Sequence, residues 1–373
     1  MTKVSVGLIW IAVGIPLLIA VSLIVRILNP DIAESPGAVS TMGAARWNHT
    51  ATLLPNGKVL VVGGLGPGAL SSTELYDPSS NSWSPSGRLA VARASHTATL
   101  LPSGKVLVVG GQGNSGSLSD AELYDPSSES WSPAGTMAKA RSSPSATLLQ
   151  NGKVLVAGGM PYTDTAELYD PLTNTWSSAG RTLNDLLSFH TATLLPSGNV
   201  MVVGRFFGRP KLYKPSSETW SYTGAVGFWS DPKNAYHTAT LLPTGKVLVA
   251  GGETGRYHNP TSSTFLYDPS SNTWSSAGDM VHSRKGHTAT LLPNGKVLVA
   301  AGSLWFRVSS SAAELYDPTS DTWSPAGRLA KLRSNHTATL LPSGKVLFAG
   351  GQGNSGALSS AELYDPSQAA QTR

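Results

Sequence analysis

Short apolar stretches alternate with polar turns along nearly the whole chain, and the order in which they come repeats. Residues 96–131 read HTATLL, a Pro-Ser-Gly-Lys turn, VLVVGG, a Ser/Gly/Asn-rich run, AELYD, an Asp-Pro-Ser-Ser turn and a segment centred on Trp131. Val, Leu, Thr, Tyr and Trp favour strands, and Gly, Pro, Asn and Ser favour the turns between them. Beyond the N-terminus no window has the 3.6-residue period of an amphipathic helix. The pattern predicts four short strands in each unit.

The unit occurs seven times, at a spacing of about 45–50 residues, which is the signature of a repeat architecture. Seven units of four strands predict an all-β fold, a seven-bladed β-propeller of four-stranded antiparallel blades. With Ser145 taken as the third start, the units open with the phrase His/Ser-x-Ala-Thr-Leu-Leu or its shortened form at His49, His96, Ser145, His190, His237, His287 and His336.

The two ends of the repeat region complement each other. The seventh unit stops after Tyr364-Asp365-Pro366 without a Trp-centred strand, so only six strands of that kind are marked, by Trp83, Trp131, Trp176, Trp220, Trp274 and Trp323. Residues 41–46 align without gaps on residues 136–141, which follow such a strand. We therefore expect residues 37–41 to supply the missing strand and close the ring, because closure removes free sheet edges. The propeller then spans residues 37–366, and residues 367–373 form a tail.

The N-terminus carries the one long apolar run, residues 4–25. A helix of this length is about 33 Å long, enough to cross a bilayer core. Residues 1–28 are therefore predicted to be a transmembrane anchor and residues 29–36 a linker; a cleaved signal peptide is the alternative. Lys3 precedes the run, whereas the positive charge of Arg26 after the run is offset by the negative charges of Asp31 and Glu34. This charge pattern favours a single-pass protein with a cytoplasmic N-terminus and an extracytoplasmic (periplasmic or extracellular) propeller.

The Gly doublet after the second strand, the Tyr of the third and the Trp of the fourth resemble the kelch repeat. The doublet occurs at Gly63-Gly64, Gly110-Gly111, Gly158-Gly159, Gly251-Gly252 and Gly350-Gly351, whereas unit four has Gly204-Arg205 and unit six Ala301-Gly302. The resemblance covers about residues 36–366. It implies blades arranged with the first strand innermost. Known activities of the family include binding modules, galactose oxidase-like enzymes and a sialic acid mutarotase type, so the resemblance is specific for fold and not for function.

Composition excludes several kinds of chemistry. The 373 residues include no cysteine, which rules out disulfides, thiolate metal sites and the Cys-linked Tyr of a galactose oxidase-like copper site. The sequence has no P-loop, no His-Glu-x-x-His and no nucleophile elbow, so we expect no metal and no cofactor. The net charge of +5 is modest. A few arginines do not make a continuous basic groove, and nucleic acid is not an expected partner.

The units differ from one another on one side only. In an up-and-down blade, the turns between strands one and two and between strands three and four lie on one face of the ring. These turns, LPxGK and DPxS, are almost unchanged along the chain. The loops between strands two and three and the links between blades lie on the other face, here called the loop face, and they vary in length and chemistry. We expect a ligand to bind the loop face.

Arginines recur in the links that precede five units. Such residues could line the rim of a concavity and bind a carboxylate or phosphate in bidentate geometry. In the alternative, each arginine ties its link to the neighbouring blade as part of the scaffold. The five residues are Arg46, Arg93, Arg141, Arg284 and Arg333.

Aromatic and basic residues gather in the loops of units four to six. Exposed rings suit sugar faces or an apolar partner, and neighbouring arginines add cation–π attraction, although the same rings could pack under the longer loops. The aromatic residues are Phe206, Phe207, Phe228, Trp229, Tyr236, Tyr257, Trp305 and Phe306. The basic residues among them are Arg205, Arg209, Arg256 and Arg307.

The unit-opening histidines invite a metal hypothesis, but one histidine per blade spreads the side chains around a ring. We expect them to hydrogen-bond neighbouring blades instead. The same scaffold role is expected for the third-strand glutamates, Glu74, Glu122, Glu167, Glu314 and Glu362.

Together these features predict a membrane-tethered binding module, with a protein, glycan or anionic ligand on the loop face and no catalytic residues. The alternative is a sugar-active enzyme of the mutarotase type on an anionic sugar. In that case Glu253 or Asp164 would act as acid/base, and the link arginines would clamp the carboxylate.

Overall fold

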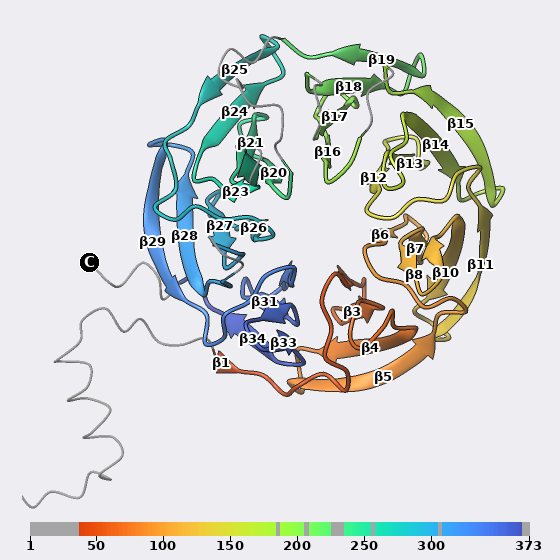
Figure 1. Ribbon diagram of the computed structural model, residues 1–373, viewed down its shortest axis with the longest axis horizontal. Coiled ribbons are helices and arrows are strands. Elements are labelled where there is room, and N and C mark those ends of the chain that lie inside the picture. Colours follow the sequence, from red (N-terminus) through yellow and green to blue (C-terminus); the bar gives the residue numbers. More distant parts are fainter. Residues whose placement is uncertain are drawn as a thin grey trace, which may run out of the picture.

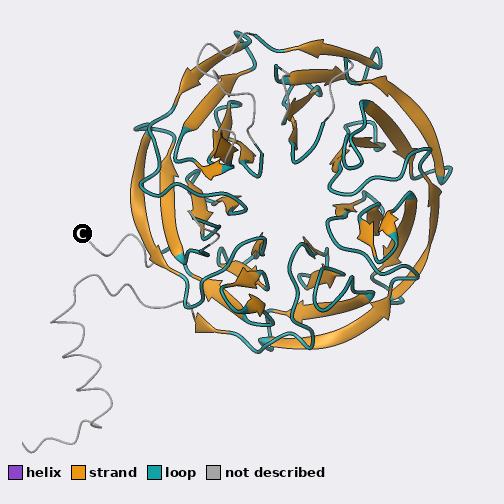
Figure 2. Ribbon diagram, in the orientation of Figure 1, coloured by secondary structure: helices purple, strands orange, loops and turns teal. Residues whose placement is uncertain are grey.

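The computed structural model describes residues 37–183, 187–204, 209–224, 235–254, 258–304 and 308–367. Within these residues seven four-stranded antiparallel sheets stand side by side in a ring, with one edge strand of each near the axis and the other at the periphery (Figure 1). Every regular element drawn for this part of the chain is a strand (Figure 2). The all-β, seven-bladed propeller predicted from the repeat is confirmed.

In each of the first four blades the strands follow one another in chain order from the axis to the periphery (Figure 1). Blade 1 contains β2 (Thr50–Leu53), β3 (Val59–Val62), β4 (Ser72–Asp77) and β5 (Ser82–Arg88). Blade 2 contains β6 (Thr97–Leu100), β7 (Val106–Val109), β10 (Asp120–Asp125) and β11 (Ser130–Thr136). Blade 3 contains β12 (Ser145–Leu148), β13 (Val154–Ala157), β14 (Thr165–Asp170) and β15 (Thr175–Arg181). Blade 4 contains β16 (Thr191–Leu194), β17 (Val200–Val203), β18 (Lys211–Lys214) and β19 (Thr219–Tyr222).

The remaining blades follow the same order. Blade 5 contains β20 (Thr238–Leu241), β21 (Val247–Ala250), β24 (Thr264–Asp268) and β25 (Thr273–Ser276). Blade 6 contains β26 (Thr288–Leu291), β27 (Val297–Ala300), β28 (Ala312–Asp317) and β29 (Thr322–Arg328). Blade 7 contains β30 (Thr337–Leu340), β31 (Val346–Ala349), β34 (Ala361–Tyr364) and β1 (Gly37–Ala38). Three small loop-face hairpins are β8–β9 (Gln112–Gly113, Gly116–Ser117), β22–β23 (Glu253–Thr254, Asn259–Pro260) and β32–β33 (Gln352–Gly353, Gly356–Ala357).

The ring is closed by the two ends of the repeat region. Strand β1 pairs antiparallel with β34, placing Gly37 opposite Leu363 and Ala38 opposite Glu362. Val39 and Met42, which follow β1, are buried against Leu347 of blade 7 and Val59 of blade 1. The closing strand is where the alignment of residues 41–46 placed it, although it is much shorter than the fourth strands of the other blades.

The apolar core lies between blades. Each second strand, such as β3, is buried along its whole length, because a neighbouring blade covers each face of the sheet. One hydrophobic cluster fills each of the seven junctions; the cluster between blades 1 and 2, for example, joins Leu60 and Val62 to Val106 and Tyr124. A run of Val and Leu is therefore required on both faces of the second strand.

The turn face opposite the loop face is as uniform in structure as in sequence. In blade 1, Lys58 follows the turn between the first and second strands, and Asp77 begins the turn between the third and fourth. Lys58 Nζ lies 3.4 Å from Asp77 Oδ2. The same lysine–aspartate pair recurs in blades 2, 3, 5, 6 and 7. Its repetition marks this face as scaffold.

The third repeat starts one residue earlier than the sequence analysis placed it. Ser145 pairs with Ala157 as Thr97 pairs with Val109, so Ser145 is the equivalent of Thr97 and Pro144 stands in the histidine position. The units were aligned on their opening histidine, and the third unit has a proline at that position, so its register could not be read from the sequence.

The predicted anchor (1–28) and linker (29–36) lie outside the described residues, as does most of the 367–373 tail. No helix found within the described ranges is both long and apolar enough to cross a membrane. The membrane anchor stays a prediction.

Candidate functional site

The five link arginines are fully buried, at 0% exposure, and do not line a rim. Each guanidinium donates to backbone carbonyls of its own blade and to the third-strand glutamate. In blade 1, Arg46 Nη1 donates to the carbonyls of Gly63 and Ser72, and Arg46 Nη2 donates to Glu74 Oε1. Glu74 also accepts the amides of Gly43 and Ala44 in the link itself. The pair therefore fastens the link to its blade, and the rim position expected for these arginines is corrected.

The same ion pair is built in blades 2, 3, 6 and 7, from Arg93–Glu122, Arg141–Glu167, Arg284–Glu314 and Arg333–Glu362. With the corrected register, Arg141 lies in line with the other four. Both partners change together in the two remaining blades: Leu187 and Lys211 replace them in blade 4, and Asn234 and Phe265 in blade 5. Because a buried charge without its partner is strongly destabilising, this joint change marks arginine and glutamate as one structural unit.

The opening histidines join neighbouring blades, as predicted. His96 Nε2 lies 2.9 Å from Thr50 Oγ1 of the preceding blade, and five further histidines make the same contact with a first-strand hydroxyl. Burial lowers the pKa of His96 to about 3, with smaller contributions from Arg93 and His49. Blade 3 breaks the series, because Pro144 offers no donor; Thr97 Oγ1 is buried without a hydrogen-bond partner in the described part of the chain.

The two acid/base candidates are both paired. Glu253 is 2% exposed; its Oε1 lies 2.8 Å from His258 Nδ1 and its Oε2 lies 2.7 Å from Lys285 Nζ. Asp164 lies 2.7 Å from Arg181 Nη2. The arginines expected to clamp a carboxylate beside these groups are inside the blades, so the geometry does not bring the three parts of a mutarotase-type site together.

Most of the predicted loop residues lie outside the described residues and remain predictions. They are Arg205, Phe206, Phe207, Phe228, Trp229, Arg256, Tyr257, Trp305, Phe306 and Arg307. Of the aromatic set, Tyr236 is described; it is 37% exposed, and its ring lies 4.5 Å from that of Phe189, centroid to centroid.

Seven residues form a collar on the loop face. Each directly precedes an opening histidine, or Pro144 in blade 3, and each has a φ of 48–59°. The collar residues are Asn48, Ser95, Ser143, Phe189, Tyr236, Gly286 and Asn335. At five of them the amide donates to the carbonyl of the collar residue one blade earlier, with N···O distances of 2.8–3.2 Å; the donors are Asn48, Ser95, Ser143, Gly286 and Asn335. The collar thus joins blades 5, 6, 7, 1, 2 and 3 by an unbroken series of backbone hydrogen bonds.

The collar is interrupted at blade 4. Among the described residues no bond of this kind joins Ser143 to Phe189 or Phe189 to Tyr236. At this place two aromatic rings stack where the other blades carry Asn, Ser or Gly. A positive φ is costly for a bulky side chain, so aromatic residues here are an unexpected choice for a scaffold position.

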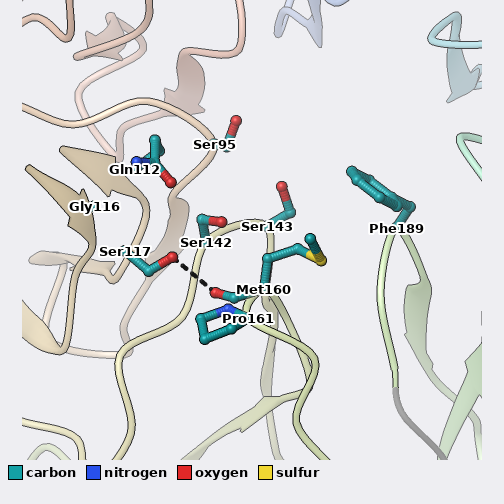
Figure 3. Close-up of a pocket in the computed structure, with 9 residues that line it drawn as sticks. All are labelled: Ser95, Gln112, Gly116, Ser117, Ser142, Ser143, Met160, Pro161 and Phe189. Atoms are coloured by element: carbon teal, nitrogen blue, oxygen red, sulfur yellow. Dashed lines mark hydrogen bonds between the residues drawn. The ribbon is translucent and has the colours of Figure 1, made fainter. Parts of the chain in front are cut away.

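A cavity of about 480 Å³ opens beside the interruption. Gln112, Gly116 and Ser117 of the β8–β9 hairpin line one side, and Ser117 Oγ donates to the carbonyl of Met160 at 2.9 Å (Figure 3). Ser142, Met160 and Pro161 lie beside the hairpin, and the collar contributes Ser95, Ser143 and Phe189, of which Phe189 stands apart from the other labelled side chains (Figure 3). The cavity is wide open to solvent. None of the lining side chains carries a charge.

Sequence reasoning missed this cavity. Its polar lining consists of serines and one glutamine, which are ordinary loop residues in a single sequence. The usable signal was the residue before each opening histidine, where Phe189 and Tyr236 replace small or polar residues. The shifted register of the third unit concealed that Ser143 belongs to the same series.

Comparison with known proteins agrees with this architecture. One family model for the kelch motif matches residues 93–138, 141–181 and 236–281, and a second matches residues 46–90. The chain is a kelch-repeat β-propeller. No curated protein matches it.

Among solved structures, the kelch-repeat chain is similar to a fungal alcohol oxidase of the AA5 family in complex with copper. The two share 20% identity with a TM-score of 0.77, over 90% of this chain and 76% of the other, a likeness that shows the fold alone. The chain has no cysteine, and in its described ranges no three His, Asp or Glu side chains gather closely enough to hold a metal ion. The residues present do not fit a galactose oxidase-like copper site.

Proposed function

We propose that this kelch-repeat propeller is a binding module whose site is the loop-face cavity beside Phe189. The carrying observation is that the cavity lies on the variable face and is lined by side chains without charge. Catalysis of proton transfer needs a titratable group within reach of the substrate, whereas recognition needs only shape, apolar surface and hydrogen-bonding groups. The cavity provides the second set.

The test measures binding and turnover on the same full-length chain. The chain is immobilised and exposed to an array of oligosaccharides and proteins, and a soluble sialic or uronic acid is followed by optical rotation. We expect saturable binding of at least one array member and no change in anomer ratio. Catalysed mutarotation would contradict the proposal and favour the enzyme alternative.

A matched pair of substitutions locates the bound surface. Ser117→Lys puts a cation into the loop-face cavity, and Ser103→Lys puts the same group on an exposed turn of the opposite face. Binding should be lost only in Ser117→Lys. Equal binding by both variants would place the ligand elsewhere.

We further propose that residues 4–25 anchor the chain in a membrane, with the propeller on the extracytoplasmic side. The support is the length of the apolar run and the position of Lys3 before it. The full chain should stay with membranes after an alkaline wash, and added protease should digest the propeller on intact cells whose outer barrier is permeable. Release by the wash would contradict the anchor.

A further inference from the structure

The cavity and the interruption of the collar occupy the same place. The backbone bonds of the collar end at Ser143, and the cavity reaches from Ser95 and Ser143 to Phe189. Neither the carbonyl of Ser143 nor the amide of Phe189 takes part in a hydrogen bond within the described residues. An acceptor and a donor are therefore left at one end of the cavity, at a blade junction where the collar bond is missing although the hydrophobic cluster and the His190–Ser145 contact join the two blades.

The polar side chains at the cavity limit the class of ligand that it can bind. Ser95, Ser142 and Ser143 carry hydroxyls, each of which can donate and accept, and Gln112 adds an amide oxygen. Gln112 Nε2 already donates to the carbonyl of Gly113, so its amide orientation is set. No lining side chain offers a counter-charge to a charged ligand. The ligand should be neutral and rich in groups that both donate and accept.

Phe189 supplies a flat apolar wall. Its ring is supported by Tyr236, at a centroid distance of 4.5 Å and an interplanar angle of 32°. Met160 and Pro161 add apolar surface on the side nearer blade 3 (Figure 3). An aromatic wall beside hydroxyls suits a molecule with one apolar face and polar groups at its edge, such as the C–H face and hydroxyls of a sugar ring.

We propose that the cavity binds an uncharged sugar ring, at the end or along the chain of a neutral glycan, and that this ring lies on Phe189 and bridges blades 3 and 4. This assignment deepens the proposed binding function and rests on it. Because the serine and glutamine groups are close to the collar, the sugar hydroxyls would complete the hydrogen bonding that the scaffold leaves open at this junction.

The test uses saturation-transfer NMR on the full-length chain with methyl glucoside, methyl galactoside, methyl mannoside and the corresponding uronic acids. At least one neutral glycoside should show saturation transfer, strongest at the protons of one ring face, and the uronic acids should bind more weakly. The decisive variant is Phe189→Asn. Asn48 and Asn335 occupy the same collar position with a φ of 51°, so asparagine fits this backbone.

Phe189→Asn should lower the affinity for the neutral glycoside at least about fivefold and leave the melting temperature of the chain unchanged. The control is Tyr162→Ser, which removes a 44% exposed aromatic that does not line the cavity and should leave affinity unchanged. No binding of any neutral glycoside, tighter binding of uronic acids, or unchanged affinity in Phe189→Asn would each overturn the sugar assignment. Saturable binding of a peptide or protein that Ser117→Lys abolishes would also overturn the sugar assignment, but it would support the proposed binding module. Catalysed turnover of a sugar would contradict both the sugar assignment and the binding module.

Discussion

At the scale of single residues, the same side-chain type serves different ends depending on its partners. Arg93 is 0% exposed and paired with Glu122, whereas the Arg181 side chain is 70% exposed beside Asp164. Removing one partner of a buried pair leaves an unpaired charge inside the protein, while an exposed pair contributes little. Burial therefore decides what each arginine contributes.

Arg93→Ala should lower the free energy of unfolding by about 3–5 kcal/mol, because Glu122 would remain buried without its counter-charge. Arg181→Ala, the control, should change it by less than about 1 kcal/mol. Urea unfolding followed by tryptophan fluorescence measures both. A near-zero effect of Arg93→Ala would reject the scaffold role and restore the arginines as candidates for an anionic ligand.

The proline in the third repeat makes a second comparison possible. Thr50→Val should cost about 1–3 kcal/mol, because it leaves His96 Nε2 without the hydroxyl that it contacts. Thr97→Val removes an equivalent hydroxyl that has no partner in the described chain, and should be neutral or stabilising. Thermal melts of the two variants are the measurement; equal losses would mean that the histidine contacts do not hold the blades together.

At the scale of elements, strand identity follows from local pattern, and the contacts between blades follow from position in the repeat. The second strands are Val/Leu runs because both faces are covered. The first strands place a hydroxyl where the next blade's histidine meets it. Five of these six histidines are buried and His190 is half-buried. Desolvation lowers the pKa of all six; it falls to about 3 for His49, His96, His190 and His287, to about 4 for His237, and well below the usual value for His336.

This burial makes the stability of the ring dependent on pH. In the unfolded chain a histidine takes up a proton near pH 6.5, whereas in the folded chain it stays neutral until about pH 3–4. The unfolded state therefore binds more protons over this window. Stability is full above pH 6.5 and falls as the pH drops through the window, by up to about 1.4 kcal/mol per pH unit for each histidine.

The slope of unfolding free energy against pH between 4 and 6 should consequently be steep and positive. His96→Gln keeps a donor for Thr50 but cannot titrate, so it should reduce the slope by the contribution of about one proton. Chemical unfolding at several pH values supplies both slopes. A flat profile would contradict the burial of these histidines.

At the scale of the whole molecule, closure holds the ring together. Strand β1 covers the edge of β34, and Val39 and Met42 fill the junction between blades 7 and 1. An uncovered edge strand is also a template for pairing with other chains. A two-residue strand thus protects the final blade from both opening and association.

Two truncations separate closure from anchoring. Deleting residues 1–36 keeps β1 and should leave the melting temperature of the propeller unchanged. Deleting residues 1–42 removes β1, Val39 and Met42 and should cost about 3–6 kcal/mol from lost burial alone, with self-association in light scattering. Identical melting of the two truncated chains would show that the N-terminal strand does not close the ring.

The sequence by itself determined the number of blades, their strand order, the closing segment and the one variable face. These properties are local, because strands, turns and Gly doublets are specified by residues that are neighbours in the sequence. They are also repeated, so seven copies of the unit support the same prediction. Only the tertiary structure decided that Arg46 is internal, because its partner Glu74 is 28 residues away along the chain. It alone brought Ser95, Ser143 and Phe189 of three blades beside one cavity, since which side chains meet across blades depends on exact register and on backbone bonds that no single repeat contains.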